Sequence, residues 1–412
     1  MSKYQLPSEL VAPDYAGGSI ANVPATVAKL MGVPFAGLPP LREPLWADIG
    51  EGVKRVVVII IDAWGWNLFQ REQARLESLL SRAKVVSQLT SVFPSTTVNA
   101  LSCLWTGLAP AQHGLVGLRI LMPEQGVLGQ MLQLGPNFTK VPGSLVTAGV
   151  EPEAFLTGLG MAEQLAAGGV PTYAFKGWEI VDSALSKMHG RGVAGNYGAY
   201  SFAHMMMQVR TLLEEKAGES LYACAYWPMV DTLSHEYGWD GEVVAAELEA
   251  LVGQIERILL DGVSGAGGEG TAVFVVADHG QIVLPREQRL FLREHRALQE
   301  MMLMRAGGEP RTLYAYARQG RVDDIIAYCE AHWSEGMWAW PTEAVLAAGL
   351  LGPKPYAAEA ALRLGDVVIS MREGYVLLNP DEEKKAEIMM GRHGGLTAAE
   401  MEVPLLGFRL DS

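Results

Sequence analysis

Three almost wholly apolar runs, each followed by an aspartate, constrain most strongly what this 412-residue chain can fold into. The runs cover residues 55–61, 221–230 and 271–277, and the aspartates that follow them are Asp62, Asp231 and Asp278. Valine and isoleucine follow one another without polar alternation, which is typical of strands buried on both faces of a sheet. Amphipathic helical patterns at 203–216 and 242–260 separate the runs. This alternation predicts an α/β fold with a mostly parallel central sheet and helices on both faces.

Polar side chains at the ends of the runs form the first candidate site. The carboxyl ends of parallel strands line one edge of a sheet and hold its ligands, so we expect Asp62, Asp231 and Asp278 with His279 to converge there. His235 follows Asp231 by four residues, which places both on one face of a helical turn. His393 precedes two glycines that allow a close backbone approach. Taken singly, these features also fit a surface ion pair, a hydrogen-bonded strand end and a turn histidine.

A run of hydroxyl residues before a helical pattern forms the second candidate site. The segment Phe93-Pro-Ser-Thr-Thr97 leads into a predicted helix that continues to Thr106. Ser95, Thr96 and Thr97 could each cap this helix. A hydroxyl at a helix N-terminus also lies among free backbone N–H groups, where a phosphate binds and an alkoxide is stabilised. Capping and nucleophilic chemistry both remain open from the pattern alone.

Considered together, these features match the requirements of phosphoryl transfer assisted by metals. Two cations roughly 4 Å apart can activate a nucleophile and stabilise a leaving oxygen, and they need about six protein ligands. The chain offers six carboxylates and imidazoles: Asp62, Asp231, His235, Asp278, His279 and His393. Such ligands suit zinc or manganese. Three cysteines without a Cys-x-x-Cys pair support neither a thiolate zinc site nor a disulfide framework.

Charge and hydropathy restrict the partners. The formal net charge is −14, which repels a nucleic-acid duplex but does not exclude a small anionic substrate once metal cations are bound. No basic stretch followed by an apolar run opens the chain, and no apolar run reaches the ~20 residues that span a bilayer. We therefore expect a cytoplasmic protein without a membrane partner. The sequence does not indicate an oligomeric state.

The domain organisation follows from a change of pattern late in the chain. Residues 286–385 contain a predicted long charged helix at 286–304 and strand-like runs at 311–316 and 366–371. We interpret them as an inserted subdomain or sheet extension. Residues 1–285 and 386–412 would then form the metallohydrolase core.

The motifs in their order along the chain resemble those of the alkaline phosphatase superfamily, most closely its nucleotide pyrophosphatase/phosphodiesterase branch. The resemblance runs from about residue 55 to residue 280 and again around His393. It is carried by Ile61-Asp62, Phe93-Pro-x-x-Thr97, Thr106-Gly-Leu-x-Pro-x-x-His113-Gly, Asp231-x-x-x-His235-x-Tyr-Gly, Asp278-His-Gly and His393-Gly.

The resemblance implies a role for each matching residue. Asp231, His235 and His393 match the ligands of one zinc ion. Asp62, Asp278 and His279 match those of the other, which Thr97 also reaches as the nucleophile. The implied reaction is a double displacement through a phosphothreonine or nucleotidyl-threonine intermediate. Thr96 is the rival nucleophile, and His113 occupies a family position that is structural rather than ligating.

The substrate class is less determined than the metal centre. The branch usually carries a phosphate-contacting asparagine three residues after the nucleophile, where this chain has Ala100; Asn99 lies about 100° away around the helix. We favour hydrolysis of phosphodiester or nucleotide pyrophosphate bonds, with a phosphomonoesterase, a phosphonate hydrolase or a non-catalytic metal-binding protein as alternatives. Arg392 and Arg119 are the cations nearest the motifs, which a monoester would require. Tryptophans flank the motif segments and could stack a base, namely Trp64, Trp66, Trp105, Trp227 and Trp239.

Overall fold

A twisted seven-stranded sheet forms the larger part of the molecule. The computed structural model describes residues 6–139 and 141–411. The strands run in the order β2 (Val85–Thr90), β18 (Glu402–Arg409), β9 (Thr271–Val276), β1 (Arg55–Ile61), β8 (Leu221–Trp227), β6 (Thr172–Gly177) and β7 (Val193–Ala199). All neighbouring pairs from β9 to β7 are parallel, whereas β18 runs antiparallel to both of its neighbours. The predicted mostly parallel sheet is confirmed.

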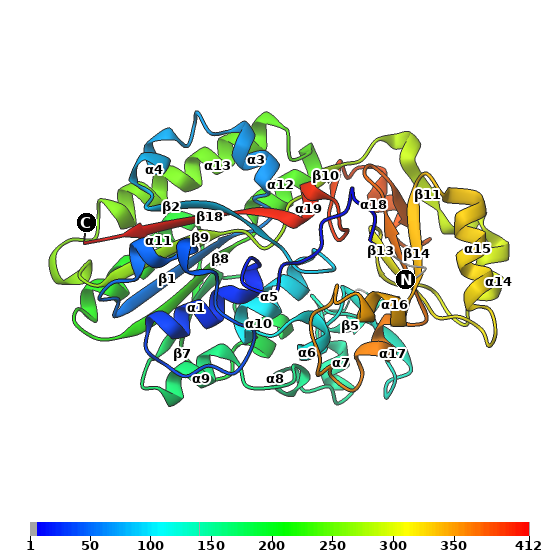
Figure 1. Ribbon diagram of the computed structural model, residues 1–412, viewed down its shortest axis with the longest axis horizontal. Helices are drawn as coiled ribbons and strands as arrows, with labels where there is room; N and C mark the ends of the chain where they lie inside the picture. Colours follow the sequence, from blue (N-terminus) through cyan, green and yellow to red (C-terminus); the bar gives the residue numbers. More distant parts are fainter. Residues whose placement is uncertain (1–5, 140, 412) are drawn as a thin grey trace.

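Helices cover both faces of this sheet, as predicted (Figure 1). One face carries α3 (Trp66–Arg71), α4 (Glu77–Arg82), α11 (Phe202–Glu215), α12 (Met229–Tyr237) and α13 (Glu242–Gln254). The other carries α1 (Val23–Leu30), α5 (Thr97–Thr106), α9 (Met161–Ala167) and α10 (Ala184–His189). The helical patterns at 203–216 and 242–260 are confirmed by α11 and by α13 with the π-helical turn Ile255–Leu260 that follows it. Every residue of β1 is buried between the two helical layers.

One strand is shorter than its apolar run. Strand β8 ends at Trp227, and helix α12 begins at Met229, so the strand predicted for 221–230 was wrong over its last three residues. Val230 is fully buried from the first turn of the helix. A continuous apolar run does not distinguish a buried strand from the buried start of a helix. Asp231 therefore projects from a helix and not from a strand end.

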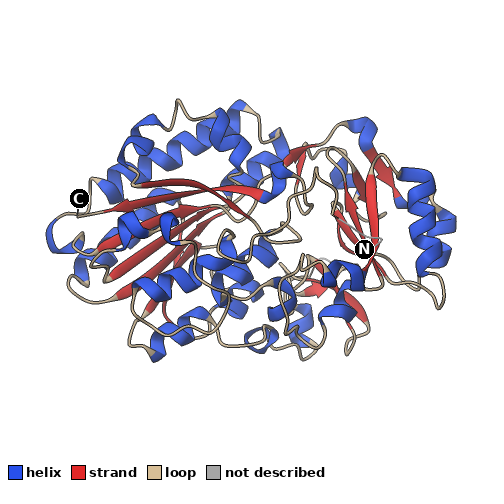
Figure 2. Cartoon of the chain, viewed as in Figure 1, coloured by secondary structure: helices blue, strands red, loops and turns tan. Residues whose placement is uncertain are grey.

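A second seven-stranded sheet faces the carboxyl edge of the first (Figure 2). Its strands run in the order β14 (Met337–Pro341), β15 (Val367–Met371), β13 (Thr312–Ala315), β12 (Gly307–Glu309), β3 (Arg119–Met122), β4 (Val127–Gln130) and β5 (Gly135–Pro136). The predicted strands at 311–316 and 366–371 are confirmed by β13 and β15. Helices α14 (Arg296–Met301) and α15 (Val322–Trp333) lie on its outer side (Figure 1).

Three strands of this second sheet come from residues 119–136, far upstream of the others. Strand β12 joins the two groups through the pairing of Gly308 with Arg119. The proposed domain limits at 285 and 386 stay a prediction, but the sheet itself draws on both sides of residue 286.

The long helix predicted for 286–304 was wrong. The segment forms two short 3-10 turns, strand β11 (Arg289–Phe291) and the six-residue helix α14. Strand β11 pairs in parallel with β16 (Val376–Leu378), a partner more than 80 residues away. Pairing across the fold thus overrides the local helical preference of this charged segment.

Short elements complete the region between the two sheets. Strand β10 (Ile282–Val283) pairs with β17 (Gly391–Arg392), and α19 (Ala398–Met401) precedes β18. The remaining short helices are α2 (Ala47–Gly50), α6 (Pro110–His113), α7 (Ser144–Thr147), α8 (Pro152–Phe155), α16 (Thr342–Ala347), α17 (Ala360–Leu364) and α18 (Glu383–Ala386). Within the described residues, no helix has the length and apolar character that crossing a membrane requires.

Candidate metal centre and nucleophile

The first group of candidate metal ligands lies at the ends of the adjacent strands β1 and β9. Asp62 follows β1, and Asp278 and His279 follow β9; all three are buried. His279 Nε2 lies 3.4 Å from Asp62 Oδ1 and 3.4 Å from Asp278 Oδ2. Neither of these two carboxylate oxygens has a hydrogen-bond partner among the described residues. Two buried oxygens without partners and one ring nitrogen therefore face a common point, which is where a cation would be held.

The other carboxylate oxygens of this group are satisfied by the protein. The Tyr226 hydroxyl donates to Asp62 Oδ2. The backbone N–H groups of Ala63 and His279 donate to Asp278 Oδ1, each over 3.0 Å. Ala63 adopts a left-handed conformation with φ of 59°, which is strained for a residue with a side chain. These contacts orient each carboxylate so that its unpaired oxygen points into the centre.

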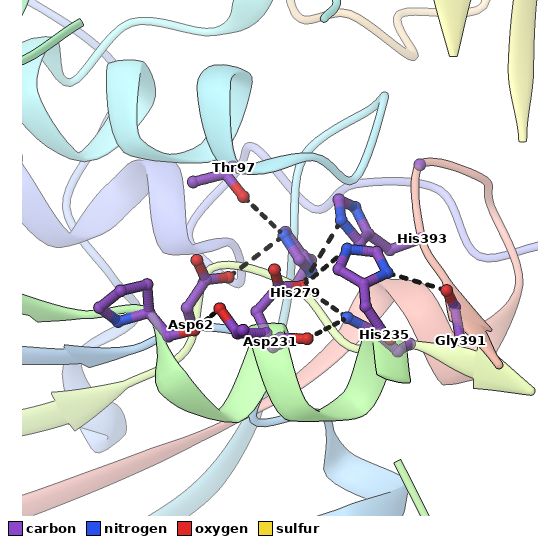
Figure 3. Close-up of polar contacts among 12 residues, drawn as sticks. Asp62, Thr97, Asp231, His235, His279, Gly391 and His393 are labelled. Carbon is purple, nitrogen blue, oxygen red and sulfur yellow. Dashed lines mark hydrogen bonds and ion pairs between the residues drawn. The ribbon is translucent and has the colours of Figure 1, made fainter. Parts of the chain in front are cut away.

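The second group lies beside the first. Asp231 and His235 share one face of α12, and His393 follows β17 (Figure 3). Asp231 Oδ1 lies 3.4 Å from His235 Nε2 and 3.6 Å from His393 Nε2. The His393 ring stacks on that of His279, with 3.8 Å between the ring centroids. Each group of three could hold one metal ion.

The three histidines share one hydrogen-bonding arrangement. The Nδ1 atom of His235 lies 2.8 Å from the carbonyl oxygen of Gly391, and those of His279 and His393 lie 3.0 Å from the carbonyl oxygens of Gly280 and Ser95. A carbonyl oxygen only accepts, so each Nδ1 carries the proton and each Nε2 presents its lone pair. This backbone contact fixes the tautomer and the ring orientation that metal ligation requires.

The electrostatics of the centre also call for cations. Burial raises the pKa of Asp62 well above its ordinary value, and the negative charge of Asp278 raises it further. Burial lowers the pKa of His235 and, together with the nearby His279, lowers that of His393 well below its ordinary value. The two imidazoles are therefore neutral, and the carboxylates repel one another until a cation lies between them.

Thr97 is the first residue of α5, and its Oγ1 lies 3.2 Å from His279 Nε2 (Figure 3). Thr96 is buried and lies near the carboxyl group of Glu309 of β12, whose pKa it lowers. The two threonines thus point to different surroundings. The hydroxyl of Thr97 adjoins the first ligand group, and the free N–H groups of the first turn of α5 lie beside it.

The two glycines after His393 are required by their neighbours. Gly394 has φ of +117°, and a Cβ atom there would lie 2.5 Å from a carboxylate oxygen of Glu309. A Cβ atom on Gly395 would lie 2.6 Å from a carboxylate oxygen of Glu400. The expected close approach of the backbone is confirmed, because side chains at these positions would push His393 away from the centre.

Several residues near the motifs lie away from the centre. Asn99 is buried, and its amide donates to the carbonyl oxygen of Pro94 over 3.4 Å. It therefore does not take the place of the asparagine that the family usually has at the position of Ala100. Arg119 donates to Gly308 O over 3.0 Å and pairs with Glu382 over 2.6 Å. His113 is fully buried beside Cys103.

The tryptophans that flank the motifs mostly pack in the core. Trp64, Trp105 and Trp227 are buried, so these three side chains pack in the core rather than offer an open face to a base. Trp66 and Trp239 are half-buried and pack against the same core. Burial of the large apolar surface of a tryptophan strongly stabilises the folded state, and this stabilisation explains why these side chains lie in or against the core.

Other residues that support the centre carry little signal in the sequence. The Gln281 amide donates to Asp231 Oδ1 and to the Asp231 carbonyl oxygen, holding that ligand in place. Its position next to the Asp278-His279-Gly280 motif could have drawn notice. Tyr226 is hidden within an apolar run, and Glu309 arrives from the second sheet, so neither had a local pattern that marked it.

Comparison with protein families bears directly on this centre. The family model described as type I phosphodiesterase / nucleotide pyrophosphatase matches residues 56–396. This chain belongs to that family. It is accordingly a hydrolase of the phosphodiesterase/pyrophosphatase type, from a family whose chemistry depends on metal. No curated protein matches the sequence significantly.

Solved structures with the same fold include proteins of animals and of a bacterium. Murine ectonucleotide pyrophosphatase / phosphodiesterase 5 superposes with a TM-score of 0.63 at 15% identity, covering 85% of this chain and 87% of its own. Phosphonoacetate hydrolase from Sinorhizobium meliloti, in complex with phosphonoformate, gives a TM-score of 0.62 at 19% identity, covering 86% and 89%. These similarities confirm the alkaline phosphatase-type fold that the motifs implied.

Proposed function

We propose that this protein hydrolyses phosphodiester or nucleotide pyrophosphate bonds with two metal ions and with Thr97 as its nucleophile. The observation that carries the proposal is the position of the Thr97 hydroxyl. It lies 3.2 Å from His279 Nε2, beside the unpaired oxygens of Asp62 and Asp278 and at the start of a ten-residue helix. A hydroxyl in such a place can be deprotonated and aimed at phosphorus.

The donor atoms suit zinc, with manganese as the other candidate. Asp62, Asp278, His279 and the Thr97 oxygen would hold one ion, and the other three ligands, Asp231, His235 and His393, would hold the second. Carboxylate oxygens and imidazole nitrogens are common zinc ligands, and the three cysteines are buried elsewhere. Bound cations would lower the pKa of the attacking hydroxyl and neutralise negative charge on the phosphoryl oxygens.

The chain's own groups then carry out two displacements. The Thr97 oxygen attacks phosphorus in line, the bond from phosphorus to the leaving oxygen breaks, and a phosphothreonine or nucleotidyl-threonine forms. The backbone N–H groups of the first turn of α5 stabilise the charged phosphoryl oxygens. Water then attacks the same phosphorus, the bond to Thr97 breaks, and the threonine regains its proton.

The family supports a diester or pyrophosphate substrate, and a nucleotide is one form of it. An inactive variant of the murine ectonucleotide protein is known in complex with AMP, at 16% identity to this chain and with a TM-score of 0.62. A phosphonate or a phosphomonoester is the second candidate, supported by the fold shared with phosphonoacetate hydrolase and by Ala100 in place of the expected asparagine.

Substrate comparison tests the reaction class. Zinc-loaded protein should turn over p-nitrophenyl thymidine monophosphate and bis-p-nitrophenyl phosphate faster than p-nitrophenyl phosphate. Faster turnover of the monoester would replace the proposed substrate class with the second candidate. Absence of turnover with all three, in zinc or manganese, would indicate a metal-binding protein without catalysis.

A pair of adjacent variants tests the nucleophile. Thr97→Ala should abolish turnover of p-nitrophenyl thymidine monophosphate while both metals stay bound, as measured by elemental analysis. Thr96→Ala, one residue away, should retain turnover. Acid quenching of the wild-type reaction followed by peptide mass spectrometry should find the nucleotidyl adduct on Thr97. Loss of turnover in Thr96→Ala but not in Thr97→Ala would identify Thr96 as the nucleophile and overturn the assignment to Thr97.

A further inference from the structure

Strand β7 is the last strand at one end of the first sheet, and its outer edge is open (Figure 1). Among the described residues it pairs with β6 alone, in parallel. The N–H of Trp178 donates to the carbonyl oxygen of Ala199 over 2.9 Å, so the backbone of Ala199 faces β6. Successive residues of a strand direct their backbone groups to opposite sides, so those of Asn196 and Gly198 point away from the sheet.

Strand β7 lacks the features that usually keep an edge strand from pairing with another chain. Lysine, proline or a covering segment normally protects such an edge. Residues 192–209, which include β7 and the first turns of α11, contain no Lys, Arg, Asp, Glu or Pro. The strand at the other end of the sheet, β2, is covered instead: the N–H of Thr90 donates to Gly18 O over 2.9 Å, and that of Asp14 donates to Thr90 Oγ1 over 2.8 Å. The edge of β7 is therefore the one at which a further strand can pair.

Exposed aromatic and apolar side chains accompany this open edge. Tyr200 is 76% exposed, Trp178 55%, Met207 45% and Tyr197 38%. The ring centroids of Trp178 and Tyr200 lie 5.7 Å apart. A buried aromatic side chain covers about 150–250 Å², so these four leave roughly 400 Å² of each chain in contact with water. Two copies that covered them would bury about 800 Å² and the strand backbone besides, which approaches the ~1,000 Å² that a specific interface requires.

A second copy of this chain is the partner that best fits the edge. The net charge of −14 makes two copies repel one another over most of their surface, and the segment 192–209 has no acidic residue to add to that repulsion. Asn196 is the middle residue of β7 and faces outward, so two β7 strands in antiparallel alignment overlap fully with Asn196 opposite its own copy. The amide of Gln208 donates to the outward carbonyl oxygen of Gly198 over 3.2 Å, and this oxygen can accept a second hydrogen bond.

We propose that this protein forms a two-fold symmetric dimer in which the β7 strands of two copies pair antiparallel and join the first sheets into one continuous sheet. The two-fold axis is perpendicular to the sheet, so the α11 helices of the two copies lie side by side on one face and cover Met207. Because the paired strands run in opposite directions, the carboxyl edge of one sheet adjoins the amino edge of the other. Each copy therefore keeps its own metal centre, and the inference does not depend on the proposed function.

Sedimentation velocity at micromolar concentrations of the full chain tests the dimer. The wild type should sediment with twice the mass of the 44.5-kDa chain. Asn196→Pro removes the outward N–H without touching the pairing with β6, and it should give a monomer with an unchanged circular dichroism spectrum. Asn196→Ala loses the same side-chain hydrogen bond to Val181 O but keeps the N–H, and it should stay dimeric. Tyr200→Glu places a charge in the covered patch and should raise the dissociation constant of the dimer about 10- to 100-fold. Leu362→Glu, at an exposed position of α17, should leave this constant unchanged.

An introduced cysteine tests the register of the pairing. The three native cysteines are buried, so Asn196→Cys adds an accessible thiol at the proposed two-fold axis. The Cα atoms of a hydrogen-bonded antiparallel pair lie about 5.5 Å apart, a separation that a disulfide can bridge. Mild oxidation should therefore link Asn196→Cys chains into covalent dimers and leave Leu362→Cys chains unlinked.

Four outcomes would overturn the proposal. A wild type that sediments as a monomer would exclude the dimer and leave the edge of β7 to a strand of another protein. A dimer that persists unchanged in Asn196→Pro and Tyr200→Glu would place the interface elsewhere. Equal loss of the dimer in Asn196→Pro and Asn196→Ala would exclude pairing through the backbone. Equal cross-linking of Asn196→Cys and Leu362→Cys would exclude the antiparallel register centred on Asn196.

Discussion

Replacing His113 by asparagine should produce a destabilisation that depends on pH in a way set by burial. His113 ends α6 and is fully buried. Its Nδ1 accepts from the N–H of Leu115 over 3.1 Å, and its Nε2 lies 3.4 Å from the sulfur of Cys103. Burial, with a smaller effect of the Arg363 charge, lowers the pKa of His113 to about 3. The folded protein therefore holds this imidazole neutral.

The sign and size of the effect follow from proton linkage. The histidine of the unfolded chain keeps its ordinary pKa of about 6.5, so protonation favours unfolding between that value and the folded pKa. The stability associated with a neutral His113 is present above pH 6.5 and is lost as the pH falls toward 3. Between pH 7.5 and pH 5.0 the wild type should lose about 2 kcal/mol that the asparagine variant does not lose.

Urea unfolding of metal-free protein, followed by tryptophan fluorescence at both pH values, measures the difference. His113→Asn should cost about 1–3 kcal/mol at pH 7.5, from lost hydrogen bonds and imperfect packing. That cost should shrink by about 2 kcal/mol at pH 5.0. His204→Asn, at an exposed position, is the control and should show no such change. Equal costs for His113→Asn at both pH values would refute the claim that burial keeps this histidine neutral.

Three further predictions concern the support of the centre. Gln281→Ala removes the amide that holds a ligand carboxylate and should weaken binding of one metal about 10- to 100-fold, as measured by competition with a chelator. Gly394→Ala should cost more stability than Gly320→Ala in thermal unfolding, because both have positive φ but only the former brings a Cβ atom against Glu309; equal costs would contradict this reasoning. Arg311→Met should cost about 3–5 kcal/mol in urea unfolding, since it leaves a buried carboxylate unpaired, and a cost below about 1 kcal/mol would contradict that reasoning.

Local patterns in the sequence were enough to predict the central sheet and to single out the side chains at its edge. The run at 55–61 is β1 residue for residue, and after Arg55 it is apolar at every position, as is typical of a strand buried on both faces. The six predicted carboxylates and imidazoles lie together in two groups of three, and Asp62, Asp278 and His279 of the first group meet at the ends of two adjacent strands. This convergence could be anticipated because parallel strands bring their carboxyl ends to one edge whatever the details of packing.

The second sheet was not visible in the sequence in the same way. Residues 119–136 pair with strands from 307–371, and Arg289–Phe291 pairs with Val376–Leu378. Such pairings depend on contacts between segments that are far apart along the chain, and a helical composition does not prevent them. The same reason explains why Glu309, which reaches Thr96 from β12, had no signal near the motif.

The sequence by itself determined which residues could form the centre, since their types and spacings follow from the chemistry of metal ligands and of strand ends. Only the tertiary structure decided how two similar arginines differ. Arg119 pairs with Glu382 and donates to a backbone carbonyl, whereas the buried Nε of Arg392 has no hydrogen-bond partner among the described residues. The free energy of a buried charge depends on every group packed around it, and those groups come from both sheets, so no local pattern could reveal which arginine remains available.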